Sequence, residues 1–427
     1  MPQTPLEKRS LDAVPNSPDR QQPVGFILRL AKALHTYGVP AYELETVLSA
    51  CAAKLGFGLQ CLSLPTSITI TLMLKEEAAQ TFVIRIAPGD IHLKKLRMAS
   101  EIASQVMKGE ITTIEGADAL KRLAKANRSY PDWLFVISFV LISAAMARIF
   151  GGGWNEIIGA SAAGLILGIL TLLATRFSLL TYLLPAVGAL LTTLVAHSTA
   201  YFLPGTEPYI SVVSGLIILL PGLTLTIAMA ELATQNLMSG TARIFGAGTV
   251  FILIAFGAVL GNHLASVVLP ENMAPVQIVQ LPQWTEWAAV FLGSLVLVII
   301  FQARLRDWLW VMLGGVLAFA VVKFATLIFS NAMAAFIGAI CVGAAANLVS
   351  RYSDVPGATI VVPGFIMLVP GSLGFKSLTA LLEHDIIGGL GSAFNMILVG
   401  ISLVSGLLIS SLVALPKAKG IDDLDIQ

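Results

Sequence analysis

The chain has 427 residues, of which 56% are apolar and only 12% are charged. A water-soluble protein of this length carries about 25% charged residues, so the composition excludes an ordinary soluble protein. The net charge of +1 argues against a nucleic-acid surface, and three cysteines without metal-like spacing argue against a disulfide framework or a metal centre. We therefore predict no cofactor and no nucleic-acid partner.

The charged residues are concentrated at the start of the chain. Residues 1–22 are polar and lack an apolar core, so we expect a disordered tail rather than a signal peptide. Residues 23–131 predict a cytosolic α+β domain, with a helix that Gly38 ends and a second helix over 41–55 that Gly56 ends. Strands are expected at 57–64, 67–74 and 82–86, followed by helices at 93–107 and 114–125.

This first domain contains charged side chains that a catalytic site would need, namely Glu43, Glu45, Lys94, Lys95 and Arg97. The alternative, which we favour, is that they lie on solvated helix faces. We find no nucleophile motif, metal cluster or phosphate loop beside them. We therefore predict no catalytic chemistry for this domain. The alternative hypothesis is that the chain is a membrane-tethered hydrolase that acts through this domain.

From residue 133 onward, ten apolar stretches approach or meet the length needed to cross a membrane. They cover residues 133–149, 157–173, 178–196, 210–230, 244–269, 287–302, 308–322, 324–348, 358–375 and 386–415. The sequence thus predicts a polytopic α-helical membrane protein with about ten transmembrane helices.

The positive charges predict the orientation of these spans. With the first domain inside, the cytosolic connections hold seven Lys and Arg residues against three on the other side. We expect a multi-pass protein of the cell (inner) membrane with both termini cytosolic, an extracytosolic loop at 270–285 and a cytosolic tail at 416–427.

Two stretches repeat at a constant offset of 149 residues: VVSGLIILLPG at 212–222 and VVPGFIMLVPG at 361–371 share seven of eleven positions. Each Pro-Gly pair removes a backbone donor and loosens the helix, so each is predicted to interrupt a span. Further echoes divide the membrane part into 132–269 and 286–415, with five spans each. Because five is odd, the second copy must enter from the opposite face. This predicts two inverted five-helix repeats, the architecture of many secondary transporters; the alternative is two ordinary kinks.

Paired helix interruptions indicate a binding site near the middle of the membrane. The predicted substrate-binding residues lie at the two pairs and just after them: Pro221, Gly222, Thr224, Thr226, Pro370, Gly371 and Ser372. The hydroxyls there either bind a small polar solute or bond back to their own helices.

Four ionisable residues are candidates for proton coupling or gating. Glu231 either takes up a proton, pairs with Arg243, or reaches out of the membrane as an end charge. His197 could titrate near neutral pH, and Lys376 follows the second Pro-Gly pair.

Several of these motifs together resemble the threonine/serine exporter family, over nearly the whole chain. The matching residues are 37–38, 43, 45, 55–56 and 65–69 in the first domain, and LPGLTLT (220–226), SGTAR (239–243) and LVPGS (368–372) in the membrane part. The resemblance implies efflux of a small hydroxy amino acid coupled to the proton gradient. Some relatives are linked to dicarboxylate export.

The chain also departs from this family's pattern after the first Pro-Gly pair. Relatives tend to have Asn where this chain has Ile227, Arg-Asp where it has Ala230 and Glu231, and Gly-Asp at 235–236. The acid persists as Glu231, but its neighbouring charge is lost, which leaves the substrate open.

We therefore expect a transporter, not an enzyme, that exports threonine, serine or a similar small polar metabolite by alternating access. Its partners would be that solute or a small organic acid, protons and the lipid bilayer. A dicarboxylate exporter, a passive channel and a homo-oligomeric assembly are left open.

Overall fold

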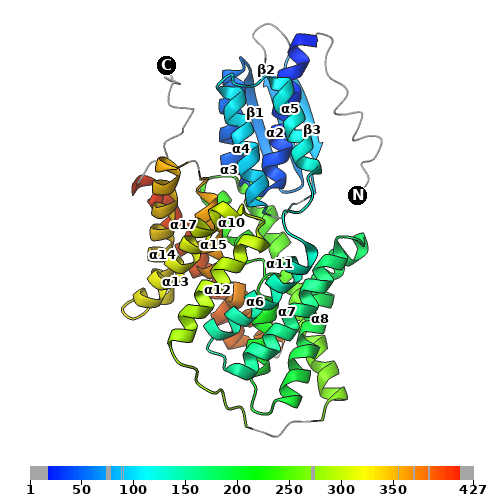
Figure 1. Cartoon of the computed structure of the whole chain (residues 1–427), viewed down its shortest axis with the longest axis vertical. Helices are drawn as coiled ribbons and strands as arrows, with labels where there is room; N and C mark the ends of the chain where they lie inside the picture. Colours follow the sequence, from blue (N-terminus) through cyan, green and yellow to red (C-terminus); the bar gives the residue numbers. More distant parts are fainter. Residues whose placement is uncertain are drawn as a thin grey trace.

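The computed structural model describes residues 18–73, 78–87, 89, 91–270, 275–353, 355–368, 371–382 and 385–413. The described chain has two parts: an α+β region (residues 18–125) and a larger bundle of helices, here called the membrane body (residues 132–413) (Figure 1).

The α+β region contains four helices and one antiparallel sheet in the order β1-β2-β3. Its elements are α2 (Pro18–Thr36), α3 (Ala41–Lys54), β1 (Gly58–Leu64), β2 (Ser67–Met73), β3 (Gln80–Arg85), α4 (Leu93–Met107) and α5 (Thr113–Lys125). Helix α2 begins before residue 23, where the first domain was predicted to start. Gly38 and Gly56 follow α2 and α3 with φ of +94° and +85°, a conformation that glycine adopts without strain.

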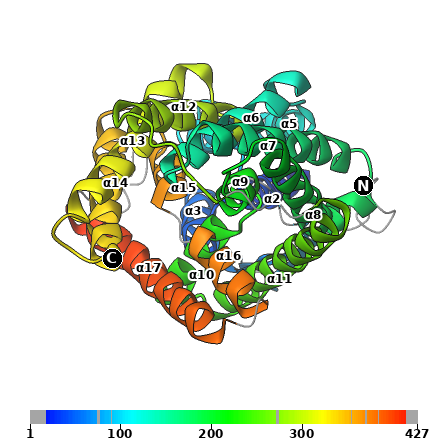
Figure 2. The same cartoon turned by 90° about the horizontal axis from the view of Figure 1, so that it is seen from below.

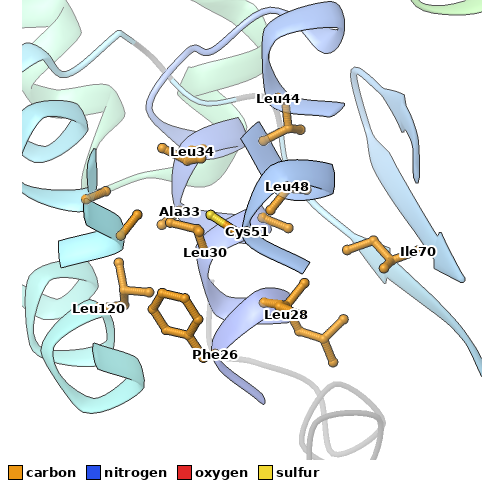
Figure 3. Packing of buried hydrophobic residues seen from close by; sticks show 14 of the residues in the cluster. Phe26, Leu28, Leu30, Ala33, Leu34, Leu44, Leu48, Cys51, Ile70 and Leu120 are labelled. Atoms are coloured by element: carbon orange, nitrogen blue, oxygen red, sulfur yellow. The ribbon is translucent and has the colours of Figure 1, made fainter. Parts of the chain in front are cut away.

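One apolar core holds this region together. The central strand β2 places Ile68, Ile70 and Leu72 on its buried face, each with no exposed surface, as alternation along a strand requires. Helices α2 and α3 cover that face with side chains such as Leu30 and Leu48 (Figure 3).

The membrane body contains twelve α-helices among the described residues. They are α6 (Asp132–Ile149), α7 (Trp154–Ala174), α8 (Ser178–Phe202), α9 (Pro208–Leu216), α10 (Gly222–Ala233), α11 (Leu237–Val268), α12 (Trp284–Ile300), α13 (Trp308–Ala325), α14 (Asn331–Tyr352), α15 (Ala358–Leu368), α16 (Gly371–Leu382) and α17 (Ile386–Val413). A short 3-10 turn, η1 (Leu305–Asp307), precedes α13.

Eight described helical stretches are long and apolar enough to span a membrane, with α15 and α16 counted together. The fold is therefore that of a polytopic helical membrane protein. Of the ten expected spans, the fourth appears as the two short helices α9 and α10, and the sixth as α12 with 17 residues.

The predicted start of the eighth span at residue 324 is wrong. Helix α13 continues to Ala325 and α14 begins at Asn331, where the Ser330 hydroxyl accepts a hydrogen bond from Met333 N (3.5 Å). The connection was hidden because its side chains are apolar: Leu327 and Ile328 are 78% and 79% exposed. Hydropathy therefore has no minimum at this turn.

Contacts with the α+β region define two ends of the membrane body. Helix α6 starts directly after that region, and Leu93 N and Lys94 N donate to Phe301 O (3.0 Å) and Gln302 O (3.1 Å), just past the end of α12. We call this side the near end and the opposite side the far end. Helix α6 thus runs away from the near end, whereas α12 runs toward it (Figure 1).

The helices α6–α11 and α12–α17 pack in the same pattern. In each set the first helix packs on the second, the second on the third and fourth, and the third and fifth on the sixth. Between the sets, α6 packs on α12, α11 on α16 and α10 on α17. Seen from the far end, the short helices α9, α10, α15 and α16 lie inside the surrounding helices (Figure 2).

Close helix contacts recur at the same offset. A Cβ atom on Gly257 of α11 would overlap the carbonyl oxygen of Ala186 on α8. The residues 149 and 150 positions later repeat this contact, because a Cβ on Gly406 would lie 2.5 Å from the carbonyl oxygen of Phe336. Only glycine allows two backbones to approach this closely.

Candidate functional site

The first Pro-Gly pair interrupts a helix, as its sequence predicts. Helix α9 ends at Leu216 and α10 begins at Gly222, with Pro221 at the N-cap position of α10. In the break, Gly222 N donates to Leu220 O (2.8 Å), which closes a tight turn. The first amides of α10 are left without partners in their own helix.

Of the second pair, the structure describes Gly371, the first described residue of α16, whereas α15 is described as far as Leu368. Pro370 lies outside the described residues, so the interruption of the helix at this pair stays a prediction. Ser372 is half-buried in the first turn of α16.

Residues beside both Pro-Gly pairs pack on the same apolar cluster, whose buried side chains come mainly from α6, α12, α13 and α15. Ile217, Ile218 and Leu223 pack against it from the first break. Ile366 and Met367 pack against it from just before the second pair. Helix α10 also contacts α15 and α16, so the described residues around the two pairs lie near each other (Figure 2).

The hydroxyls after the first pair differ in their use. Thr226 is 2% exposed and its Oγ1 donates to Gly222 O (3.1 Å), so this residue bonds back to its own helix. Thr224 and Ser372 are half-buried, and no hydrogen bond joins either hydroxyl to another described residue. These two hydroxyls are therefore the better candidates for contact with a solute.

Glu231 lies at the near end of α10, away from the breaks. Its side chain has no exposed surface, so the expectation of an end charge reaching out of the membrane is wrong. Both carboxylate oxygens accept from Arg243 Nε (3.0 and 2.9 Å), which confirms the predicted pair. One of them, Oε1, also accepts from Ala41 N (3.0 Å), the first amide of α3 in the α+β region. A carboxylate at a helix N-terminus is favoured by the helix dipole.

Further titratable groups of the α+β region surround this contact. Burial lowers the pKa of the His35 imidazole, and it raises the pKa of the Tyr42 hydroxyl. Burial also raises the pKa of the Glu45 carboxyl, against the opposing effect of a hydrogen bond from Ser63 N (2.9 Å). Glu43, by contrast, is exposed on α3.

The charges of the first domain are thus not all on solvated faces, contrary to our expectation. Arg97 is 15% exposed and pairs with Asp307 of the membrane body (2.7 Å). Arg304 of the membrane body pairs with Glu101 (2.7 Å). Together with Glu231, these contacts attach the α+β region to both sets of helices.

The other two residues predicted for proton coupling or gating are His197 and Lys376. Lys376 is exposed on α16. His197 is half-buried on α8 and lines a cavity of about 250 Å³ at the far end. Within the described part of the chain, no three His, Cys, Asp or Glu side chains are placed to hold a metal ion.

Sequence reasoning missed the rest of this cavity. Its polar lining includes Thr193, Glu207, Tyr209, Asn262 and Thr379, and Phe375 contributes an apolar side. These residues come from α8, α9, α11 and α16, so no local motif connects them. One signal in the sequence pointed to this cavity: Glu207, an acidic residue directly before Pro208 at the start of the short helix α9.

Comparison with models of known protein families identifies the family of this chain. A threonine/serine exporter model matches residues 25–265, and a second, described as "Threonine/Serine exporter, ThrE", matches residues 286–413. The chain belongs to the threonine/serine exporter family. The two matches cover the α+β region with the first helix set and then the second helix set.

The chain also resembles several fungal proteins at low sequence identity. An uncharacterized protein of Schizosaccharomyces pombe is 23% identical over 81% of this chain and 43% of its own length. The pheromone-regulated membrane protein 10 of Debaryomyces hansenii is 25% identical over 92% of this chain and 42% of its own length. The chain thus spans about half the length of these relatives. No solved structure matches it.

Proposed function

We propose that the protein is a secondary transporter that exports threonine, serine or a similar small polar metabolite by alternating access. The observation that supports this proposal is that residues beside the two Pro-Gly pairs, which are 149 positions apart, pack on one apolar cluster in the membrane body. Broken helices that meet at a repeat interface are the usual location of a transporter's substrate site. Membership of the exporter family supports the same class of function.

The two helix sets are proposed to be inverted repeats. Their packing patterns correspond helix by helix, and the first helices α6 and α12 run in opposite directions. An inversion that exchanges the two sets turns the contact of α11 with α16 into the contact of α17 with α10, and both contacts are present. The contact of α6 with α12 is turned into itself. An arrangement of this kind can expose one central site alternately to the two faces.

At the first break, and at the interruption predicted for the second pair, the freed backbone groups would bind the solute. The amino ends of α10 and α16 carry partial positive charge and suit a carboxylate, whereas the carbonyl ends of α9 and α15 suit an ammonium group. The Thr224 and Ser372 hydroxyls, both half-buried near these helix starts, would contact a polar side chain. The site therefore matches a small zwitterion.

Proton coupling is assigned to Glu231. Its carboxylate holds Arg243 and the first amide of α3 at the same time. Protonation would weaken both contacts and loosen the attachment of the α+β region to α10. A proton would in this way control the near end of the pathway.

We place the protein in the cell (inner) membrane with the α+β region and both termini in the cytosol. Exposed tryptophans at the two ends of the membrane body support a membrane that extends between these ends. Trp133 lies at the start of α6 at the near end, and Trp154 and Trp284 lie at the starts of α7 and α12 at the far end. Each of them is more than 60% exposed. Tryptophan is enriched at membrane-water interfaces.

Uptake of labelled threonine and serine into inside-out vesicles tests the proposal. We expect accumulation against the concentration gradient when a proton gradient is imposed, and loss of accumulation when it is collapsed. Flux that only equilibrates the solute would indicate a channel. Uptake of succinate but of neither amino acid would indicate a dicarboxylate exporter and contradict the proposed substrate.

A further inference from the structure

The far-end cavity is walled by both helix sets. Helices α8, α9 and α11 of the first set contribute Thr193, His197, Glu207 and Asn262, and α16 of the second set contributes Phe375 and Thr379. At about 250 Å³ the cavity has room for a small organic solute. A movement of one helix set against the other would change its shape.

One polar group of the cavity has no partner of its own in the described part of the chain. Thr193 is 3% exposed, and its Oγ1 finds no hydrogen-bond partner among the described residues. A buried hydroxyl without a partner is costly, so such a group in a cavity calls for an explanation. A bound polar solute would supply the missing partner.

The charge of the cavity favours a cation. Glu207 is half-buried and brings a carboxylate, and it lies within electrostatic range of His197. No Lys or Arg belongs to the described lining. The backbone of Glu207 is fixed, because its N–H donates to Oε1 of Glu156 (2.9 Å), itself 1% exposed. Glu156 is therefore a positioning residue. The Glu207 carboxylate caps α9 by a long hydrogen bond from Tyr209 N to Oε1 (3.4 Å), and its remaining acceptor sites are available to a ligand.

An apolar layer separates the cavity from the first break. Phe375 is 1% exposed and its ring stacks on Tyr209, with centroids 6.2 Å apart. Phe375 belongs to the same cluster as Leu216 and Leu220, which lead to the break. The cavity is thus on the far side of a barrier that a solute leaving the break would have to pass.

We propose that this cavity is a far-end binding site for small solutes that carry an ammonium group, with Glu207 as the ligand of the ammonium and Thr193 as a hydrogen-bond partner. Phe375 forms the barrier between this site and the breaks. The position of the site on an export route rests on the proposed function, but its preference for ammonium over carboxylate does not. A dicarboxylate without an ammonium group is excluded from it.

Equilibrium binding of labelled ethanolamine to the purified full-length protein at pH 7 tests this site. Ethanolamine has an ammonium and a hydroxyl but no carboxylate, so it lacks the group that the helix starts at the breaks would bind. We expect Glu207→Gln to weaken binding roughly ten- to hundred-fold, as loss of a charged hydrogen bond implies. Thr193→Val should weaken it several-fold, and excess succinate should not compete.

Thr192→Val is the matched control. Thr192 is fully buried next to Thr193 and its hydroxyl also lacks a partner among the described residues, but it does not line the cavity. Unchanged binding in Glu207→Gln, or no binding to the wild-type protein, would overturn the site. Vesicle uptake of threonine by the same variants separates the two proposals. Wild-type uptake without Glu207-dependent binding removes only the cavity, and Glu207-dependent binding without any uptake removes only the transport function.

Discussion

The far and near ends of the membrane body use corresponding positions differently. At the far end, Thr193 faces Gly261, and the Thr193 hydroxyl has no described partner. At the near end, Gly343 corresponds to Thr193 (150 residues later) and Ser410 corresponds to Gly261 (149 residues later). The hydroxyl is therefore on the sixth helix of the second set, whereas in the first set it is on the third helix. There Ser410 Oγ donates to Leu407 O (2.6 Å), and Asn347, which corresponds to His197, donates to Ser410 O (3.0 Å).

The two helix sets therefore share their packing but not the hydrogen bonding of their polar side chains. At the near end Ser410 and Asn347 are hydrogen-bonded within the helices, and the α+β region contacts that end through Glu231. At the far end Thr193 and His197 line a cavity. The difference between these two places therefore comes from a few side chains and from the α+β region, and not from the arrangement of helices.

The largest effect on stability is expected from removing the near-end acid. Glu231→Gln leaves Arg243 without its charged partner and weakens the contact with Ala41, so the free energy of unfolding should fall by about 3 kcal/mol. Thermal unfolding of the purified protein measures this. Limited proteolysis near residues 126–129 should also become faster as the α+β region detaches.

The shared packing can be tested at its glycines. Alanine at Gly257 or at Gly406 would place a Cβ against a facing backbone carbonyl, so each substitution should cost about 2 kcal/mol of stability. Gly246→Ala is the control, since a Cβ there meets nothing within 4 Å. A cost at one site of the pair and none at the other would break the correspondence between the two helix sets.

The near end should also respond to acid through His92. Burial lowers the pKa of His92 from 6.5 to about 4, so the unfolded chain binds a proton more readily between these values. Stability should be complete above pH 6.5 and fall by roughly 2 kcal/mol as the pH drops toward 4. His92→Asn removes the titrating group and can still cap α4, so denaturant unfolding at several pH values should show a flatter profile for this variant. An equally steep profile would exclude His92 as the cause.

A far-end pair provides the smallest expected effect. Glu286 pairs with Lys323, and both side chains are partly exposed, at 21% and 36%. Glu286→Gln should therefore change stability by only about 0.5 kcal/mol in thermal unfolding. A loss as large as that of Glu231→Gln would remove the contrast between the two ends.

Local signals in the sequence predicted several parts of this fold. The Pro-Gly pair at 221–222 interrupts its helix, Gly38 and Gly56 follow helix ends, and β2 alternates as its residues imply. Each of these depends on neighbours in the chain. The start of α14 was missed because an apolar connection gives hydropathy no minimum.

The candidate sites could not be predicted completely, because they are formed by contacts between residues far apart in the sequence. Glu231 and Ala41 are 190 residues apart, so the capping of α3 could not be read from either segment. The far-end cavity combines four helices from both sets. Only His197 in its lining stood out in the sequence, because ionisable residues in apolar segments are conspicuous.

The most direct test of the central claim is proton-driven uptake of threonine into inside-out vesicles by Gly222→Leu, Gly371→Leu and Gly246→Leu. Gly222 is buried at the first break and Gly371 belongs to the second Pro-Gly pair, whereas Gly246 is an exposed helix glycine with open space around it. We predict that both break variants insert into the membrane at normal levels but lose transport, and that Gly246→Leu transports normally. Normal uptake by both break variants would contradict a substrate site between the broken helices.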